Sequence, residues 1–320
     1  MPSGRRPGQA FEVKSFGDPM YEAFYGLKQR PFSIVPQAEF LYLTQQHRTA
    51  LSLLEYGILK PSVFSLITGD IGTGKSTLVR HLLARLGGSV SVGVIGNTHK
   101  AFGELLEWSL QAFGLDFRGK DKVEMFQVLS NYLMHEFVKN RRVVLVVDEA
   151  QNMSIDALEE LRMVSNVNVD RHHLLQIILV GQTRLREKLR LPALQQFAQR
   201  IETEFHLRPL AVDDVESYVR YRLKIAGSLD GDLFTADACK AIHRISRGVP
   251  RLINLVCDTA LVYGFAAARA RIDNDLIDEL DRDKRDQGGW LFDPVKDTPV
   301  KNGFEPVENI GKVPILRAAS

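Results

Sequence analysis

The sequence has 320 residues, 45% of them hydrophobic, which is enough apolar material for one large domain and a smaller one. Its 41 Lys and Arg residues are offset by 39 Asp and Glu residues, so the net charge of +2 neither indicates nor excludes a nucleic-acid partner. Two cysteines are too few for a disulfide framework, and no apolar run approaches the roughly 18 residues that span a bilayer. We therefore expect a cytoplasmic chain without integral membrane insertion.

The two ends of the chain lack the patterns of folded elements. Residues 1–19 contain two arginines without a following apolar stretch, which excludes a secretory signal and predicts a flexible N-terminal arm. Residues 286–320 mix charge, Gly and Pro without periodicity and predict a flexible C-terminal tail. The chemistry is expected between these ends.

Between the ends, short runs rich in Val and Ile alternate with helical patterns, which is typical of a parallel sheet covered by helices. The runs predict five strands, near 63–68, 89–95, 143–147, 174–180 and 204–207. After Pro209 the strand signal disappears and successive helical patterns follow. The sequence thus predicts an α/β domain with a five-stranded parallel sheet over residues 20–208, followed by an all-helical domain over residues 209–285.

The stretch GDIGTGKST follows the first predicted strand, precedes a helical pattern and fits G-x-x-x-x-G-K-[ST]. Glycines let the backbone N–H groups face phosphates at the positive end of the helix dipole. Lys75 supplies a cation for the outer phosphates, and Ser76 offers a hydroxyl to magnesium. A flexible turn is the alternative, which the flanking strand and helix disfavour. The predicted nucleotide-binding residues are Gly69, Asp70, Ile71, Gly72, Thr73, Gly74, Lys75, Ser76 and Thr77.

The stretch VVLVVDEAQNMS predicts a buried strand that ends in two carboxylates, Asp148 and Glu149, which strand alternation would send to opposite sides. Asp148 is expected to hold magnesium through water, and Glu149 to orient and deprotonate an attacking water. A pair of acids near the start of a helix is the alternative. Neither a guanine-binding N-K-x-D element nor the serine-glycine signature of ABC cassettes is present, so ATP is the expected nucleotide.

Two arginines stand in unusual places. In LQQFAQRI, the residues at 194, 197, 198 and 201 share one helical face, and Arg200 lies at its edge just before a predicted strand. Arg251 follows Pro250, which fits the first position of a helix, so its cation would lie at the positive end of the helix dipole. That placement costs helix stability, so a compensating interaction is expected.

The order of motifs resembles the AAA+ ATPases of the ExeA-like branch. The resemblance extends over roughly residues 20 to 285, including YEAFYGLKQRPFSIVPQAEFLYLTQQHRTALSLLEYGI near its start, and its motifs are GDIGTGKST, VVLVVDEAQ, LLQIILVGQTRLREKL, FAQRI, HLRPL and RGVPRLINLVCDTAL. Such relatives are linked to secretion and exopolysaccharide (exosortase-associated) systems and are similar to ATPases that select transposition targets. The resemblance implies a P-loop AAA+ fold with a helical lid, hydrolysis of ATP with Mg²⁺, and assembly into a ring or filament of identical subunits.

The resemblance also implies roles for three residues. Arg200 would be an arginine finger that reaches the γ-phosphate in the adjacent subunit, and a local pair with Glu202 or Glu204 is the alternative. Arg251 would be sensor 2, a lid residue that touches the phosphates, unless it pairs with a core acid. Gln182 stands where many relatives carry an Asn, Thr or Ser that senses the attacking water, and a plain loop role is equally open.

Three classes of function follow. The resemblance favours an ATP-fuelled assembly factor of an envelope secretion or exopolysaccharide system, peripheral at the inner membrane through a protein partner. An ATP-dependent DNA-binding regulator is the second class, and its support is a basic stretch that is otherwise a solvated helix face: Arg184, Arg186, Lys188 and Arg190. A small-molecule kinase that shares only the phosphate loop is the third.

The remaining candidates are aromatic residues and cysteines. Phe32, Phe40 and Tyr42 are expected either near the adenine end of the site or in the core. Cys239 and Cys257 lack the spacing of metal ligands and are expected to be small buried hydrophobes.

Overall fold

The computed structural model describes residues 20–35, 37–60, 62–96, 104–169, 172–229 and 231–292. The described chain divides into two compact units between Leu280 and Asp281, and the first unit carries the sheet and the site. The predicted N-terminal arm and most of the predicted tail lie outside the described residues. The expected boundaries at 208/209 and 285/286 stay predictions.

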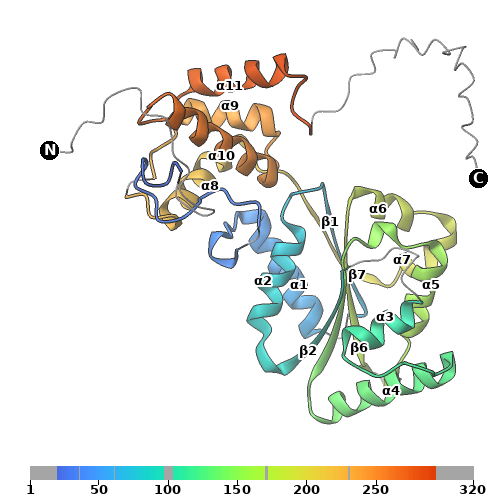
Figure 1. Ribbon diagram of the computed structural model, residues 1–320. Coiled ribbons are helices and arrows are strands. Elements are labelled where there is room, and N and C mark those ends of the chain that lie inside the picture. Colours follow the sequence, from blue (N-terminus) through green and yellow to red (C-terminus); the bar gives the residue numbers. More distant parts are fainter. Residues whose placement is uncertain are drawn as a thin grey trace, which may run out of the picture. The chain divides into compact units, whose positions relative to one another are not determined.

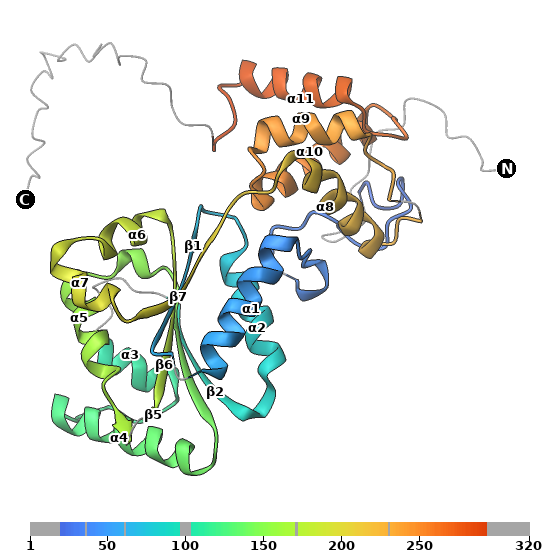
Figure 2. The same cartoon turned by 180° about the vertical axis from the view of Figure 1, so that it is seen from behind.

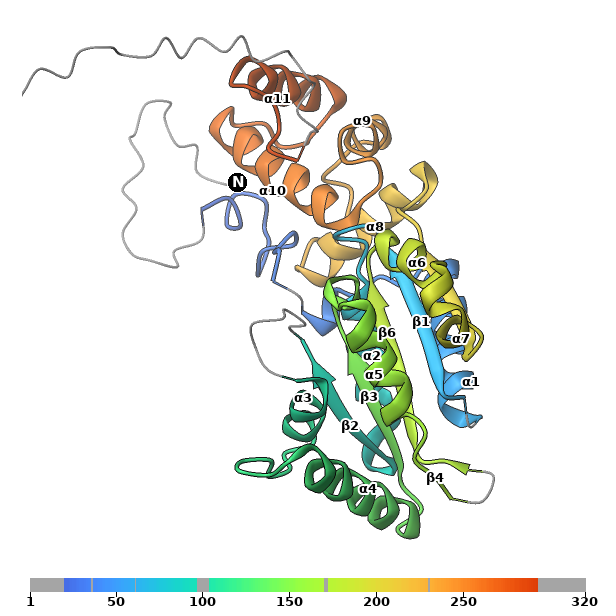
Figure 3. The same cartoon turned by 90° about the vertical axis from the view of Figure 1, so that its right-hand side faces the viewer.

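Five parallel strands form the central sheet, as predicted (Figures 1 and 3). In their order across the sheet they are β2 (Val90–Ile95), β3 (Arg142–Val147), β6 (Leu175–Gly181), β1 (Phe64–Gly69) and β7 (Ile201–Leu207). Every residue of β1 and β6 is buried, which suits strands that are covered on both faces. This order places β6 directly beside β1, the strand that precedes the predicted phosphate loop.

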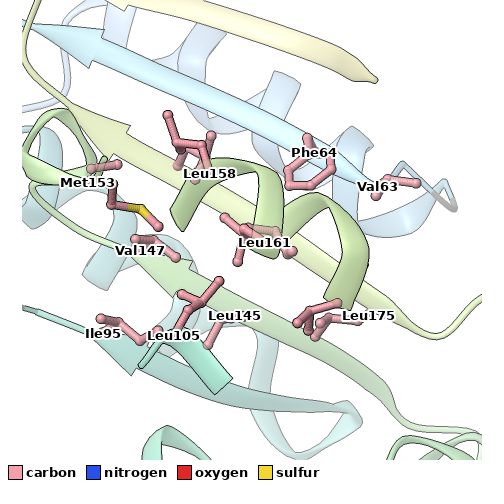
Figure 4. Close-up of a cluster of buried hydrophobic side chains, with 14 of the residues drawn as sticks. Val63, Phe64, Ile95, Leu105, Leu145, Val147, Met153, Leu158, Leu161 and Leu175 are labelled. Atoms are coloured by element: carbon pink, nitrogen blue, oxygen red, sulfur yellow. The ribbon is translucent and has the colours of Figure 1, made fainter. Parts of the chain in front are cut away.

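Helices cover both faces of this sheet, and β3 shows why its sequence is a continuous apolar run. Val143, Leu145 and Val147 pack into one buried cluster, whereas Val144 and Val146 pack into another (Figure 4). The helices of the second cluster are α1 (Gln45–Leu59) and α2 (Lys75–Leu86). The opposite face carries α3 (Leu105–Ala112), α4 (Lys122–Val138), α5 (Ile155–Val164), α6 (Thr183–Leu189) and α7 (Gln195–Ala198), as Figure 2 shows.

The last strand begins earlier than predicted. The expected helical face through residue 201 is wrong there, because α7 ends at Ala198 and Ile201 already pairs with Phe64 of β1. β7 is an edge strand, and the exposed Glu202 and Glu204 alternate with more buried residues along it. Those charges hid the strand pattern. A two-stranded antiparallel pair, β4 (Asn168–Val169) with β5 (His172–His173), was also not predicted.

The region after Pro209 is helical, as predicted. Its helices are α8 (Val212–Ile225), α9 (Ala236–Ser246), α10 (Pro250–Ala266) and α11 (Asn274–Asp286). The hydroxyl of Thr235 accepts from the N–H of Ala238 and caps α9, and Pro250 occupies the first turn of α10. Cys239 and Cys257 are both buried, which confirms their prediction.

Candidate nucleotide-binding site

The three loops that carry the predicted site residues lie at the carboxyl ends of the strands, because parallel strands all end on the same side of the sheet. The phosphate loop follows β1, Asp148 and Glu149 follow β3, and Gln182 follows β6. A hydrogen bond joins two of these loops, since the hydroxyl of Thr183 donates to Oδ1 of Asp70 at 3.0 Å. Strand order alone therefore brings together residues that are more than a hundred positions apart in sequence.

The phosphate loop needs its glycines for conformation and for space. Gly72 and Gly74 have φ angles of 82° and 95°, in the left-handed region, and Gly74 directly precedes Lys75, the first residue of α2. A Cβ on Gly72 would lie 2.7 Å from the Cβ of Arg251. The loop thus turns tightly into the N-terminus of a helix, where backbone N–H groups favour an anion.

The amine of Lys75 lies inside this loop. It donates to the carbonyl oxygens of Gly69 at 2.9 Å and of Asp70 at 2.7 Å. Burial lowers the pKa of Lys75, and the nearby carboxylates of Glu149, Asp148 and Asp70 oppose that effect. A polyphosphate would offer this buried amine a charged acceptor that is stronger than two carbonyls.

The two carboxylates after β3 differ from the predicted alternation. The strand ends at Val147, and Glu149 adopts a left-handed conformation with φ 54°. Oδ1 of Asp148 accepts from the backbone N–H of Glu149 at 2.9 Å. The turn, and not the pleat of a strand, therefore sets the directions of the two side chains.

Gln182 contacts Glu149. Its Nε2 donates to Oε2 of Glu149 at 3.3 Å, and its backbone N–H donates to Oε1 of Gln151 at 3.0 Å. Nε2 of Gln151 donates to the same Oε2 of Glu149 at 2.5 Å. The predicted sensing position therefore reaches the predicted base through hydrogen bonds, and Gln151 is a third member that sequence reasoning missed.

A cavity of about 390 Å³ connects these groups with the helical region. Its walls include the loop from Ile71 to Thr77, together with Glu149, Gln182 and Arg251. Phe40 and Tyr42 also line it, whereas Phe32 is buried against Phe234, with ring centroids 5.8 Å apart. The volume suits a small ligand that is enclosed on several sides.

Arg222 is a buried cation in this wall that the sequence did not reveal. Its guanidinium donates to the carbonyl of Pro31 at 2.6 Å and to the hydroxyl of Tyr218 at 3.0 Å, and it lies 4.8 Å from the ring centroid of Phe40. Within the described ranges it makes no ion pair. Tyr218 in turn donates to Oδ1 of Asn254 at 2.7 Å, so Arg222 ties the segment before α1 to two helices of the helical region.

His47 of α1 lines the cavity and contacts the phosphate loop. It is buried, its Nδ1 lies 2.7 Å from the hydroxyl of Thr44, and it hydrogen bonds with the backbone of Thr73. Burial lowers the pKa of His47, against the hydrogen bond to Thr73. The sequence signal that could have identified His47 is a histidine at a helical position that faces apolar residues, within the stretch TQQHRTAL.

Arg200 lies away from the cavity of its own subunit. It donates to Oδ1 of Asn166 at 2.5 Å, and the expected local alternatives are not its partners, because Glu204 pairs with Arg186 and Glu202 accepts from the N–H of Val63. Arg200 precedes β7, whose first residue is level with the start of β1, whereas the phosphate loop follows the end of β1. Five residues at about 3.3 Å each separate the two ends by about 17 Å.

Arg251 lines the cavity beside the phosphate loop. Its backbone N–H donates to the carbonyl of Gly72 at 3.2 Å, and its side chain is exposed. Across the described residues it forms no ion pair, so the alternative of a salt bridge to a core acid finds no support. Pro250 occupies the first turn of α10, as predicted.

The basic stretch of α6 is partly engaged within the protein. Arg186 pairs with Glu204 at 2.7 Å, and the amine of Lys188 donates to two backbone carbonyls. Arg184 and Arg190 are exposed. Half of the cations that suggested a nucleic-acid surface are therefore used in internal contacts.

Comparisons with known proteins agree with this geometry. Residues 60–189 match a family model described as AAA domain. The chain is 39% identical over 275 residues to General secretion pathway protein A of Aeromonas hydrophila, covering 85% of this chain and 50% of the relative. Among solved structures it resembles the ORC2 protein of Aeropyrum pernix, with TM-score 0.57, 17% identity and coverage of 79% and 71% of the two chains. The Aeropyrum pernix ORC1 protein in complex with DNA gives TM-score 0.55, 16% identity and coverage of 81% and 72%.

The five-stranded sheet, the phosphate loop and the match over residues 60–189 show that the chain contains a P-loop domain of the AAA+ fold class. Within that class it is similar to General secretion pathway protein A, which confirms the predicted resemblance to the ExeA-like branch. The chain spans half the length of that relative. In the part of the chain that the structure describes, none of the helices has the length and apolar character to cross a membrane.

Proposed function

We propose that this chain binds ATP with Mg²⁺ and hydrolyses it to ADP and phosphate. The observation that carries the proposal is the position of Glu149 in the wall of the cavity that also contains the phosphate loop. Lys75 and the loop N–H groups hold the phosphates, and Glu149 orients the attacking water and accepts its proton. Gln182, bonded to Glu149, is placed to donate a hydrogen bond to the same water.

The residues for magnesium fit its chemistry. Ser76 lines the cavity in the first turn of α2, and Asp148 follows β3 at the same edge of the sheet. A hydroxyl and a carboxylate are oxygen ligands of the kind that Mg²⁺ prefers. When bound, the ion neutralises charge on the phosphate oxygens, while Lys75 and Arg251 supply fixed cations beside them.

We propose that hydrolysis requires a homo-oligomer, in a ring or filament. Arg200 is about 17 Å from the phosphate edge along its own sheet, so it cannot serve the site of its own subunit. A guanidinium held by the neutral amide of Asn166 at 2.5 Å keeps its charge for another acceptor. In this proposal Arg200 stabilises transition-state charge on the phosphates of the adjacent subunit.

The similarity to General secretion pathway protein A supports a role in an envelope secretion or exopolysaccharide system. In such a system the chain would act from the cytoplasm, peripheral at the inner membrane through a protein partner. A DNA-binding regulator has less support, because only Arg184 and Arg190 of the basic stretch are exposed without an ion pair among the described residues.

The first experiment compares ATP hydrolysis by the wild-type protein and by Glu149→Gln, with Mg²⁺, and measures ATP binding for both. We expect hydrolysis to fall at least a hundredfold while ATP still binds, since the amide keeps the shape but cannot accept the proton. Glu187→Gln, an exposed change on α6, is the matched control and should leave hydrolysis unchanged. Normal hydrolysis by Glu149→Gln would contradict the assignment of the base.

A second experiment separates the candidate partners. Glu149→Gln with ATP is titrated with labelled double-stranded DNA across a salt series, because phosphate contacts give a steep negative salt slope. ATP-dependent binding with such a slope would favour the DNA-binding regulator. Absence of binding at low salt, by protein that has assembled with ATP, would leave the envelope partner as the target.

A further inference from the structure

Gln151 uses both ends of its side-chain amide at the site. It lies in a short 3-10 turn, Ala150–Asn152, directly after Glu149. Its Nε2 donates to Oε2 of Glu149 at 2.5 Å, and its Oε1 accepts from the backbone N–H of Gln182 at 3.0 Å. One amide thus links the ends of β3 and β6, at the two loops that carry the proposed base and sensor.

The space for this bridge depends on a small neighbour. Gly181 ends β6, and a Cβ at that position would lie 3.0 Å from Oε1 of Gln151 and 2.6 Å from the side chain of Leu185. Glu149 and Gln182 line the cavity, whereas Gln151 stands behind them and contacts both through its side-chain amide. Its side chain therefore acts on the cavity through these two residues.

A cation from α6 fixes the turn on which Gln151 stands. The amine of Lys188 donates to the backbone carbonyls of Gln151 and Met153, each at 2.6 Å. Burial lowers the pKa of Lys188, and no carboxylate among the described residues pairs with it. The ammonium satisfies carbonyls of a turn that would otherwise be held by few bonds.

We propose that Gln151 is a positioning residue for Glu149, and that Lys188 holds the turn that carries both. The inference rests on the proposed role of Glu149 as the base. A glutamate carboxylate turns easily about its last bonds, and two amide donors on one oxygen, from Gln151 and Gln182, restrict that freedom. Because misplacement of a base by about 1 Å costs as much as a hundredfold in rate, the restriction is worth a measurable factor.

Two substitutions separate the two hydrogen bonds of Gln151. Gln151→Met keeps the length of the side chain and removes both bonds. Gln151→Glu keeps an oxygen that accepts from the N–H of Gln182 but replaces the donor to Glu149 with a second carboxylate. If Gln151 had only a structural role, the two variants would lose the same amount of stability. Hydrogen exchange at the Gln182 amide would then not differ between them.

The measurements are steady-state kinetics, ATP affinity and hydrogen exchange of the peptide that contains the Gln182 amide. We expect both variants to lower kcat at least tenfold with KM and ATP affinity within about twofold of wild type. Exchange at Gln182 should accelerate in Gln151→Met and stay protected in Gln151→Glu. Lys188→Met should lower kcat in the same direction, and Lys188→Arg, which keeps a cationic donor, should recover part of it.

The outcomes distinguish this inference from the proposed function. A wild-type protein that hydrolyses ATP, together with Gln151→Met at unchanged or raised kcat, overturns the positioning role and leaves the proposed function intact. Unchanged Gln182 exchange in Gln151→Met also overturns it. A wild-type assembly that binds ATP without hydrolysing it overturns the proposed function itself, and the role of Gln151 in hydrolysis falls with it.

Discussion

The two ends of the parallel strands differ in the residues that they present to a nucleotide. The edge at the carboxyl ends of the strands collects the phosphate loop, Glu149 and Gln182 around one cavity. The opposite edge holds Arg200 on a neutral amide, beside the start of β7. A sheet about 17 Å long keeps these groups apart within one subunit. This separation within one subunit is what supports the proposal that a complete set of charges requires two copies of the chain.

The largest expected effect is at Lys75. Lys75→Ala removes the buried amine that now donates to Gly69 and Asp70, and we expect ATP affinity to fall at least a hundredfold. Fluorescent nucleotide titration measures it. Arg200→Ala, on the other edge, should bind ATP as the wild type does. Equal losses in both variants would erase the distinction between the two edges.

A smaller effect is expected from crowding the phosphate loop. Gly72→Ala places a Cβ 2.7 Å from the Cβ of Arg251 and forces a side chain onto φ 82°, so the loop and α10 must move apart. We expect ATP affinity to fall about tenfold with KM rising in parallel. Gly88→Ala is the matched control, because nothing lies within 4 Å of its added Cβ. An unchanged affinity in Gly72→Ala would show that the loop tolerates the displacement.

Arg222→Met tests how the segment before α1 is held. The change leaves the carbonyl of Pro31 and the hydroxyl of Tyr218 without their donor, which costs about 1–3 kcal/mol for buried polar groups. Chemical denaturation should report that loss in the free energy of unfolding. Arg220→Met, which breaks only exposed pairs with Glu216 and Asp232, should cost less than about 1 kcal/mol. Equal costs would remove the special role of Arg222.

The smallest expected effect is a pH dependence from His47. Burial lowers the pKa of His47 in the folded state, so the unfolded chain takes up the proton first as pH falls below about 6.5. The stability linked to a neutral His47 is therefore present above that pH and is lost as pH falls through the folded-state pKa. His47→Gln should flatten the unfolding free energy over this window relative to wild type. An unaltered slope would show that other groups, such as His206 with its own lowered pKa, carry the dependence.

The sequence was most informative where structure and chemistry are local. Central strands such as β1 and β6 are buried on both faces and appear as continuous apolar runs, whereas β7 is an edge strand with glutamates at exposed positions and was placed three residues late. The predicted phosphate loop is contiguous in sequence, and the structure places it between β1 and α2 as the motif predicts. Arg222 was not predicted from the sequence, because its partner Pro31 is distant along the chain and only the packing of the helical region brings the two residues together.

Gln151 and the carboxylates show the same limit at short range. The motif identified Asp148 and Glu149, but a left-handed turn at Glu149, and not strand alternation, aims the side chains. Gln151 stood inside the same motif, and its role emerged only from the bond to Gln182 of another strand's loop. Backbone conformation after a strand ends is weakly encoded by pattern, which explains these differences.

The most direct test of the account mixes two inactive variants. Lys75→Ala subunits keep Arg200 but bind ATP at least a hundredfold more weakly, whereas Arg200→Ala subunits bind ATP and lack the proposed finger. In a mixed assembly, some interfaces therefore combine an intact ATP site of one subunit with Arg200 of its neighbour. We predict that mixing restores a substantial fraction of wild-type hydrolysis, while Arg142→Ala, an exposed arginine at the same edge of the sheet, stays active alone. Mixtures that stay inactive, or Arg200→Ala that hydrolyses ATP alone at the wild-type rate, would contradict a site completed by Arg200 of a second copy.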